Sequence, residues 1–275
     1  MLTRRLSRKE VTELGLYDFL GYIGAFNTPH IGGLAGTRNL IASLDVSDRK
    51  NFRVLEVGCA TGYASCMLAS EYGCQVVGID LSEILIQKAQ ERARKMNLDN
   101  VEFRVANAMD LPFDDNSFDA MFGVAITALL RSRKKGLSEY MRVVRPGGKI
   151  GTLDLFLKTD APEAVADQFS TMMSELLGGE VNIRTIDDWT SFYESSGLED
   201  IKIQEFYENV LENPQERVRA VKATLKMVYH MIINKTIRKR MMRLMRLRKT
   251  AISQDSEQFR YLGYLLFTGC NPLAH

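Results

Sequence analysis

One stretch of this 275-residue chain joins an acid to two closely spaced glycines. Glu56, Gly58 and Gly62 lie where an apolar run, 52–57, gives way to a helical pattern. Glycines let a ligand approach the backbone closely, and the following helix N-terminus directs free N–H groups towards it. A dinucleotide site would have G-x-G-x-x-G, but Ala60 takes the place of the middle glycine. Glu56 would repel a pyrophosphate and attract an ammonium group, so the pattern disfavours dinucleotide binding.

A second candidate, Asp80, ends the next apolar run about 20 residues further on. A carboxylate at the end of a strand can accept hydrogen bonds from both hydroxyls of a ribose. Asp80 could instead only cap the next helix, but Ser82 already serves as its N-cap. The spacing therefore favours ribose binding.

These residues need a sheet to position them, and the apolar runs supply one. Short strands alternate with helical segments, which predicts a parallel sheet with right-handed crossovers and a ligand site at the carboxyl ends of its strands. The first predicted strands are 52–57, 75–79, 101–105, 118–124 and 149–156, and the helices between them are 63–72, 82–96 and 137–144. Helices 161–177 and 186–196, strand 201–206, a basic helix 215–249 and a β-rich run 259–269 follow.

Four motifs carry a family resemblance: EVGCATG at 56–62, GID at 78–80, LPFDDNSFD at 111–119 and RPGG at 145–148. In this order and spacing they resemble class I S-adenosylmethionine-dependent methyltransferases, in the branch that includes quinone, sterol and arsenite methyltransferases. The resemblance covers residues 50–156, and a final hairpin through Gly269 also fits.

The resemblance implies an α/β fold: a Rossmann-like, seven-stranded, mostly parallel sheet with helices on both faces and an antiparallel last strand. It also implies an enzyme with an N-terminal helical lid and a helical insertion before the last strand. We expect a lid at 1–48, a cofactor-binding core at 49–206, a basic insertion at 207–257 and the final strand at 258–275.

S-adenosylmethionine is the implied cofactor. Its expected binding residues are Glu56, Gly58, Cys59, Gly62, Asp80, Leu81, Asn107, Ala108 and Met109. The first four lie at the methionine side, Asp80 holds the ribose, and the remainder surround the adenine. Ala60 replaces the usual middle glycine, and Asn107 replaces an Asp that accepts from the adenine amino group. An Asn can still accept through its carbonyl oxygen, so we expect weaker binding rather than none.

The acceptor is less defined. The predicted strand 118–124 ends in the apolar sequence GVAITA, without the Asn-Pro-Pro-Tyr of nucleobase methylation or a carboxylate cluster for a divalent metal. We therefore expect no metal and a small or lipid-like acceptor. Candidate catalytic residues are His30, Tyr17 and Tyr22, although His30 could equally bond a turn backbone and the tyrosines could pack the lid. The four cysteines form no CxxC pair, provide too few thiols for arsenite chemistry, and suit a reducing cytoplasm.

The net charge is only +2, but the charge is unevenly distributed and one segment is strongly basic. Residues 217–250 contain twelve Lys or Arg and no acid, so the remainder, with 24 basic and 34 acidic residues, is acidic. The apolar residues of this segment recur at spacings of three and four, so we expect this apolar stripe to pack on the body. The basic charges could belong to a solvated helix that faces an acidic neighbouring surface, to a helix that binds a membrane surface at 217–249, or to an RNA-binding arm with few aromatics for base stacking. No run is long enough to cross a membrane, so we expect a cytoplasmic protein, with membrane contact only peripheral. Alternative functions are RNA or protein methylation through this helix, and a non-catalytic cofactor-binding subunit.

Overall fold

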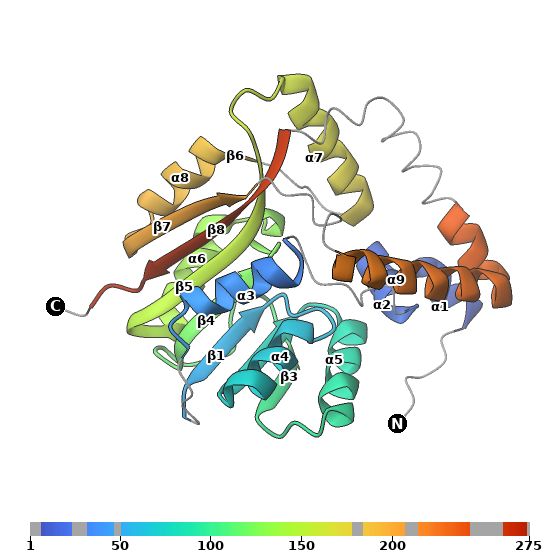
Figure 1. Ribbon diagram of the computed structural model, residues 1–275, viewed down its shortest axis with the longest axis horizontal. Coiled ribbons are helices and arrows are strands. Elements are labelled where there is room, and N and C mark those ends of the chain that lie inside the picture. The colour runs from blue at the N-terminus through green and yellow to red at the C-terminus, as the bar shows by residue number, and fades with distance from the viewer. Residues whose placement is uncertain are drawn as a thin grey trace.

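The computed structural model describes residues 7–23, 32–46, 51–177, 184–206, 214–242 and 261–273. Within them, short apolar segments form one sheet in the order β3-β2-β1-β4-β5-β8-β7 (Figure 1). The strands are β1 (Arg53–Val57), β2 (Gln75–Asp80), β3 (Val101–Val105), β4 (Phe118–Val124), β5 (Val144–Leu157), β7 (Glu199–Phe206) and β8 (Leu262–Cys270). A two-residue strand, β6 (Arg184–Thr185), pairs with β5 outside this path.

The predicted mostly parallel sheet is confirmed. Strands β1 to β5 pair in parallel, and β8 runs antiparallel to both of its neighbours, β5 and β7. The strand order reverses between β1 and β4, and such a switch point is where open α/β sheets bind ligands. The main path has the seven strands that the sequence predicts, and β6 is an addition.

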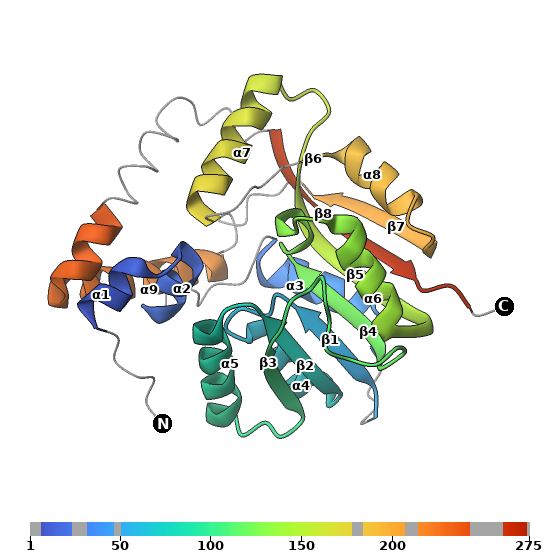
Figure 2. The same cartoon turned by 180° about the vertical axis from the view of Figure 1, so that it is seen from behind.

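Helices cover both faces of this sheet because successive strand residues point to opposite sides. Val54 packs with α3 (Gly33–Ser43) and α4 (Tyr63–Tyr72), whereas its neighbour Leu55 packs with α6 (Arg133–Val143) and α8 (Ile186–Glu194). α5 (Glu83–Lys95) lies beside α4, and α7 (Glu163–Leu177) follows β5. Figures 1 and 2 show these two helical layers from opposite sides. The sequence assigns the residues of α3 to the lid, but the structure shows that α3 packs on the sheet.

Two boundaries differ from the sequence prediction. α6 begins at Arg133 rather than at residue 137, because the hydroxyl of Ser132 accepts from the backbone N–H of Lys135 and caps the helix. β5 begins at Val144 and continues through Pro146 and the following glycines, which the sequence indicates as a turn.

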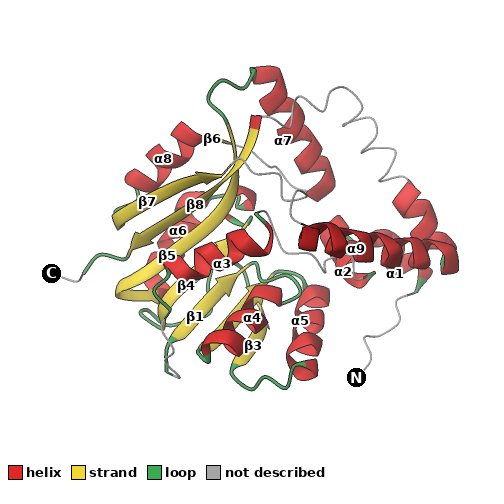
Figure 3. Cartoon of the chain, in the orientation of Figure 1, coloured by secondary structure: helices red, strands yellow, loops and turns green. Residues whose placement is uncertain are grey.

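A group of helices stands beside the sheet rather than on it (Figure 3). It comprises α1 (Arg8–Glu13), α2 (Leu16–Tyr22), α9 (Pro214–Ile233) and a further helix, 235–242. The prediction of a single helix at 215–249 is wrong, because Asn234 separates two helices. The side-chain oxygen of Asn234 accepts from the N–H groups of Thr236 and Ile237 and so caps the second helix. Residues 243–249 of that prediction lie outside the described residues.

One face of α9 is apolar and exposed. Its stripe comprises Val218, Val221, Leu225, Val228 and Ile232, which are between 41% and 70% exposed. The expected packing of this stripe on the body is therefore wrong. Met227 and Met231, on another side of the helix, contact the cluster formed by Phe19 and its neighbours. None of the described helices is long and apolar enough to cross a membrane.

Candidate active site

The glycine turn after β1 adopts the left-handed backbone that its sequence suggests. Gly58 and Gly62 have φ of 72° and 70°, and Ala60 has φ of 47°. A Cβ at Gly62 would lie 2.5 Å from the ring of Phe103, so no other residue fits there without a shift. The left-handed conformation at Ala60 costs about 1 kcal/mol of conformational free energy, whereas a glycine adopts it without this cost. The turn is thus closely held, with one strained position between its glycines.

Glu56 lies fully buried beneath this turn. The hydroxyl of Ser65 donates to Glu56 Oε2, while Oε1 has no partner among the described residues. Burial raises the pKa of Glu56 to about 8, against the Ser65 hydrogen bond, which lowers it. A buried acid with a free oxygen fits the ammonium of a methionine moiety better than a phosphate, because a nearby cation would stabilise its ionised form.

Asp80 ends β2 and joins the glycine turn to the start of α5. Its Oδ2 accepts from the N–H of Ala60 at 3.0 Å, and its Oδ1 accepts from the N–H of Ser82 at 2.9 Å. Burial raises the pKa of Asp80, and these two N–H donors lower it. Each oxygen keeps a second lone pair, so a ribose can donate to a carboxylate whose orientation is already fixed.

The adenine end of the site combines an exposed apolar side chain with a polar turn. Leu81 is 72% exposed beside Asp80, so its side chain is accessible to a ligand. Asn107 Oδ1 accepts from the N–H of Met109 at 3.0 Å, and Ala108 is buried. These residues fit an adenosine moiety between Leu81 and the Asn107 turn.

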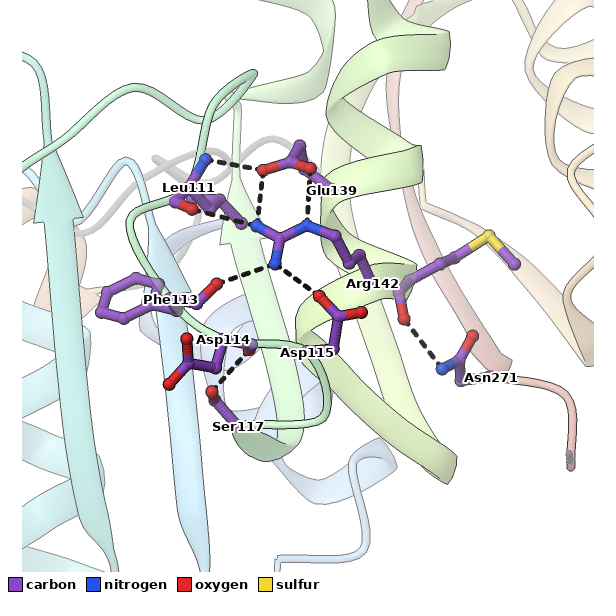
Figure 4. Close-up of polar contacts among 9 residues, drawn as sticks. Leu111, Phe113, Asp114, Asp115, Ser117, Glu139, Arg142 and Asn271 are labelled. Carbon is purple, nitrogen blue, oxygen red and sulfur yellow. Dashed lines mark hydrogen bonds and ion pairs between the residues drawn. The ribbon is translucent and has the colours of Figure 1, made fainter.

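The motif at 111–119 follows this turn and is bound to α6 by a group of hydrogen bonds and ion pairs (Figure 4). Arg142 of α6 donates to the carbonyls of Leu111 and Phe113 and to the carboxylates of Asp115 and Glu139, at 2.7–3.0 Å. Glu139 in turn accepts from the N–H of Leu111 at 2.7 Å. The sequence analysis missed Arg142 and Glu139, because only their i, i+3 spacing in an unremarkable helix marks them.

The loop after β4, residues 125–130, closes the carboxyl edge of the sheet; we call it the β4 loop. Ala125 has φ of 56°, and residues 127–129 form a short 3-10 helix. The side chain of Ile126 lies across Gly58 and Gly123, where added Cβ atoms would be 3.1 Å and 2.6 Å from it. The carboxyl ends of β1 and β4 are therefore covered by an apolar side chain.

α2, which lies in the segment that the sequence predicts to be a lid, contacts the start of α5 beside this site. The hydroxyl of Ser82 donates to the carboxylate of Asp18, and a Cβ at Gly21 would overlap the side chain of Leu85. α2 consequently rests on the N-terminus of α5, next to Asp80. Neither Asp18 nor Gly21 stands out in the sequence.

The remaining predicted site residues contribute no side chain to this group that the structure shows. The side chain of Cys59 is fully buried in the core, so a contact with a cofactor would come from its backbone, and its binding role stays a prediction. Tyr22 is partly buried against Phe19 and its neighbours, which is a packing environment. His30 lies outside the described residues, and so does the side chain of Tyr17. Over the described residues, no group of His, Cys, Asp and Glu could hold a metal ion.

Comparison with known proteins agrees with this geometry. The model of the methyltransferase-domain family matches residues 48–197. An uncharacterized protein of Haemophilus influenzae is 33% identical over 188 residues, 67% of this chain and 72% of that protein. The chloroplastic tocopherol O-methyltransferase of Arabidopsis thaliana is 29% identical over 59% of this chain, which spans about half (48%) of that enzyme.

A solved structure has the same fold. Phosphoethanolamine N-methyltransferase 2 of Haemonchus contortus, solved with S-adenosyl-L-methionine, superposes with a TM-score of 0.70 and is 18% identical in sequence. The match covers 98% of this chain and 61% of that one. The chain belongs to the methyltransferase-domain family and is an S-adenosylmethionine-dependent methyltransferase.

Proposed function

We propose that the acceptor is a small, lipid-like molecule that offers an oxygen, nitrogen or carbon nucleophile. The observation that carries this proposal is the apolar carboxyl edge of β1 and β4, where Ile126 lies across Gly58 and Gly123. The tocopherol O-methyltransferase among the relatives points the same way.

S-adenosylmethionine, when bound, supplies a methyl group on a positively charged sulfur. In our proposal Asp80 holds the ribose, Leu81 and Asn107 hold the adenine, and Glu56 stabilises the ammonium group. Methyl transfer is an in-line displacement, so holding the acceptor in line with the methyl group supplies much of the rate. The β4 loop and the lid would provide that alignment and exclude water.

The first test is calorimetric titration with S-adenosylmethionine and S-adenosylhomocysteine, on the wild type and on Asp80→Ala. We expect micromolar binding by the wild type and at least tenfold weaker binding by the variant, since charge-assisted hydrogen bonds to the ribose are lost. Exposed Asp160→Asn is the matched control. Methylation is then assayed by mass spectrometry with a prenylated phenol, catechol and a tRNA mixture. Turnover of the phenol alone supports the proposal, whereas turnover of RNA alone overturns it.

We further propose that the exposed stripe of α9 contacts an anionic membrane surface. Val221, Leu225 and Ile232 provide apolar anchors, and Lys235, Arg238 and Lys239 of the adjoining helix are exposed. A basic segment with an exposed apolar face suits anionic lipid, which would also give access to a membrane-dissolved acceptor.

Vesicle co-sedimentation tests this contact. We expect binding to phosphatidylserine-containing vesicles, weak binding to pure phosphatidylcholine, and loss of binding in Val221→Gln/Leu225→Gln. Leu273→Gln changes an exposed apolar residue elsewhere and should bind as the wild type does. Equal binding by both variants, or binding of tRNA but not of vesicles, would contradict the proposal.

A further inference from the structure

A buried carboxylate lies directly under the β4 loop. Asp154, on β5, is fully buried, and its Oδ1 accepts from the N–H of Ala128 at 3.3 Å. Burial raises the pKa of Asp154 to about 6, against the hydrogen bond from Ala128, which lowers it. Asp154 therefore contacts the loop through the backbone N–H of Ala128.

This carboxylate is not explained by stability. Its Oδ2 and the hydroxyl of Tyr140 are buried and have no hydrogen-bond partner among the described residues. Burying a charge costs several kcal/mol, and apolar residues of similar volume usually stabilise a core more. Sites that break such packing rules are commonly functional sites.

The charged and titratable groups around Asp154 come from two helices, α6 and α8. Arg133 and Tyr140 belong to α6, and the Arg133 charge lowers the pKa of Asp154. Tyr193 belongs to α8, and its hydroxyl lies 2.6 Å from that of Thr152 on β5. The negative charge of Asp154 contributes to the raised pKa of both tyrosines, behind their burial.

The β4 loop is strained and is held to β5 by two backbone N–H groups. Ala125 has a left-handed backbone, which an alanine rarely adopts, so other contacts must stabilise the loop in this form. The N–H of Ala125 donates to Leu153 at 2.7 Å, and Ala128 donates to Asp154. These two neighbours on β5 thus hold the loop on either side of Ile126.

We infer that Asp154 is a positioning residue, which holds the β4 loop through the backbone N–H of Ala128 so that Ile126 stays across the carboxyl ends of β1 and β4. The inference deepens the proposed function, because that edge is where the acceptor is proposed to bind. Asp154 itself is buried and need not touch the acceptor.

Two variants separate the hydrogen bond from the charge. Asp154→Asn keeps an acceptor for Ala128, and Asp154→Ala removes it; exposed Asp160→Asn is the control. In hydrogen–deuterium exchange we expect the loop peptide to exchange about tenfold faster in Asp154→Ala and close to the wild-type rate in Asp154→Asn. Calorimetry should show binding of S-adenosylhomocysteine within twofold of wild type for both. An unchanged loop in Asp154→Ala would overturn the inference.

Trp189, the single tryptophan of the chain, gives a second readout. Its indole N–H donates to the carbonyl of Leu155, the residue after Asp154. We expect its fluorescence to titrate near pH 6 in the wild type and not in Asp154→Asn. Titration in both would contradict the assignment.

The third readout is turnover of the prenylated phenol. We expect Asp154→Ala to raise its KM about tenfold with a smaller change in kcat, and Asp154→Asn to restore most of the loss. If the wild type does not methylate this phenol, the proposed acceptor fails alone, since exchange and fluorescence still test the positioning role. A phenol KM that is the same in wild type and Asp154→Ala would refute it.

Discussion

The turn at Asn107 uses its one side-chain oxygen to hold the N–H of Met109, which leaves an amide NH2 as its second polar group. That group donates and cannot accept from an adenine amino group. Asn107→Asp would offer a second acceptor in the same geometry. We expect its affinity for S-adenosylhomocysteine, measured by calorimetry, to rise three- to tenfold, about 1 kcal/mol.

Asn107→Ala is the matched control, because it loses the bond to Met109 and should bind more weakly than the wild type. Equal affinity of Asn107→Asp and wild type would mean that the adenine amino group finds its partner elsewhere.

Glu56 should couple cofactor binding to proton release. Its pKa of about 8 keeps it protonated at pH 7, and a bound ammonium group would favour its ionised form. We expect calorimetry at pH 7, in buffers of different ionisation enthalpy, to show release of up to about one proton. Glu56→Gln should release none from this position, and identical proton counts for the two proteins would show that Glu56 does not meet the ammonium.

Residue types and spacing were enough to predict the glycine turn, Asp80 and the Asn107 turn. They could not show that Cys59 points into the core, because a single buried position in a tight turn has no periodicity. They also missed Asp18 and Asp154, each of which acts through a partner at least 26 residues away in sequence. Local patterns report such contacts only when a known motif contains them.

At the scale of elements, α6 fixes the loop after β3 through Arg142. Five hydrogen bonds from a planar guanidinium cannot be reproduced by an ammonium group. We expect Arg142→Lys to lower the free energy of unfolding by about 2 kcal/mol, since the side chain is partly exposed. Urea denaturation measures this change.

Arg104→Lys is the control for that prediction, because its pair with Glu102 is exposed and should contribute less than about 1 kcal/mol. Comparable losses in the two variants would show that the Arg142 contacts add no more than a surface pair.

The contact between α2 and α5 depends on a glycine. Gly21→Ala would overlap the buried Leu85, and overpacking of this kind costs about 1–3 kcal/mol. We expect hydrogen exchange in α2 to accelerate and cofactor affinity to fall, because Asp18 would leave Ser82. The double variant Gly21→Ala/Leu85→Ala restores space and should recover exchange protection in α2. If Gly21→Ala alone leaves α2 protected, the lid does not depend on this contact.

The sequence predicted the elements of the sheet better than those of the lid. Strands β1, β2 and β4 follow apolar runs closely, because strands that are buried on both faces consist almost entirely of apolar residues. In α9 the same reasoning failed: its three- and four-residue apolar spacing indicates an amphipathic helix but not which surface covers the stripe. The break at Asn234 escaped notice because one asparagine interrupts the pattern without a proline or glycine.

For the whole molecule, two buried acids give an unusual dependence of stability on pH. Burial raises the pKa values of Glu56 and Asp154 to about 8 and about 6. Between pH 4 and 8 the unfolded chain therefore loses protons that the folded protein keeps, so stability falls as pH rises. The pKa values of Glu102 and Glu139 are lowered by Arg104 and Arg142, and that stabilisation is lost only as pH falls below about 4.5.

We expect urea denaturation to show a smaller free energy of unfolding at pH 8 than at pH 5. Glu56→Gln/Asp154→Asn should flatten this slope. A wild-type stability that rises over the same range would contradict both pKa assignments.

The position of β8 has a consequence for biosynthesis. This strand is translated after every other strand, yet it lies inside the sheet between β5 and β7 and pairs with both. Until the ribosome has released it, the edges of β5 and β7 have no partner there, and unpaired edges invite association with other chains. The glycine turn and the Asn107 turn need only β1 to β3 and could form earlier. A nascent chain could thus have its glycine turn and Asn107 turn formed while the edges of β5 and β7 are still unpaired. A chaperone that covers β5 would then protect the nascent chain from association during translation.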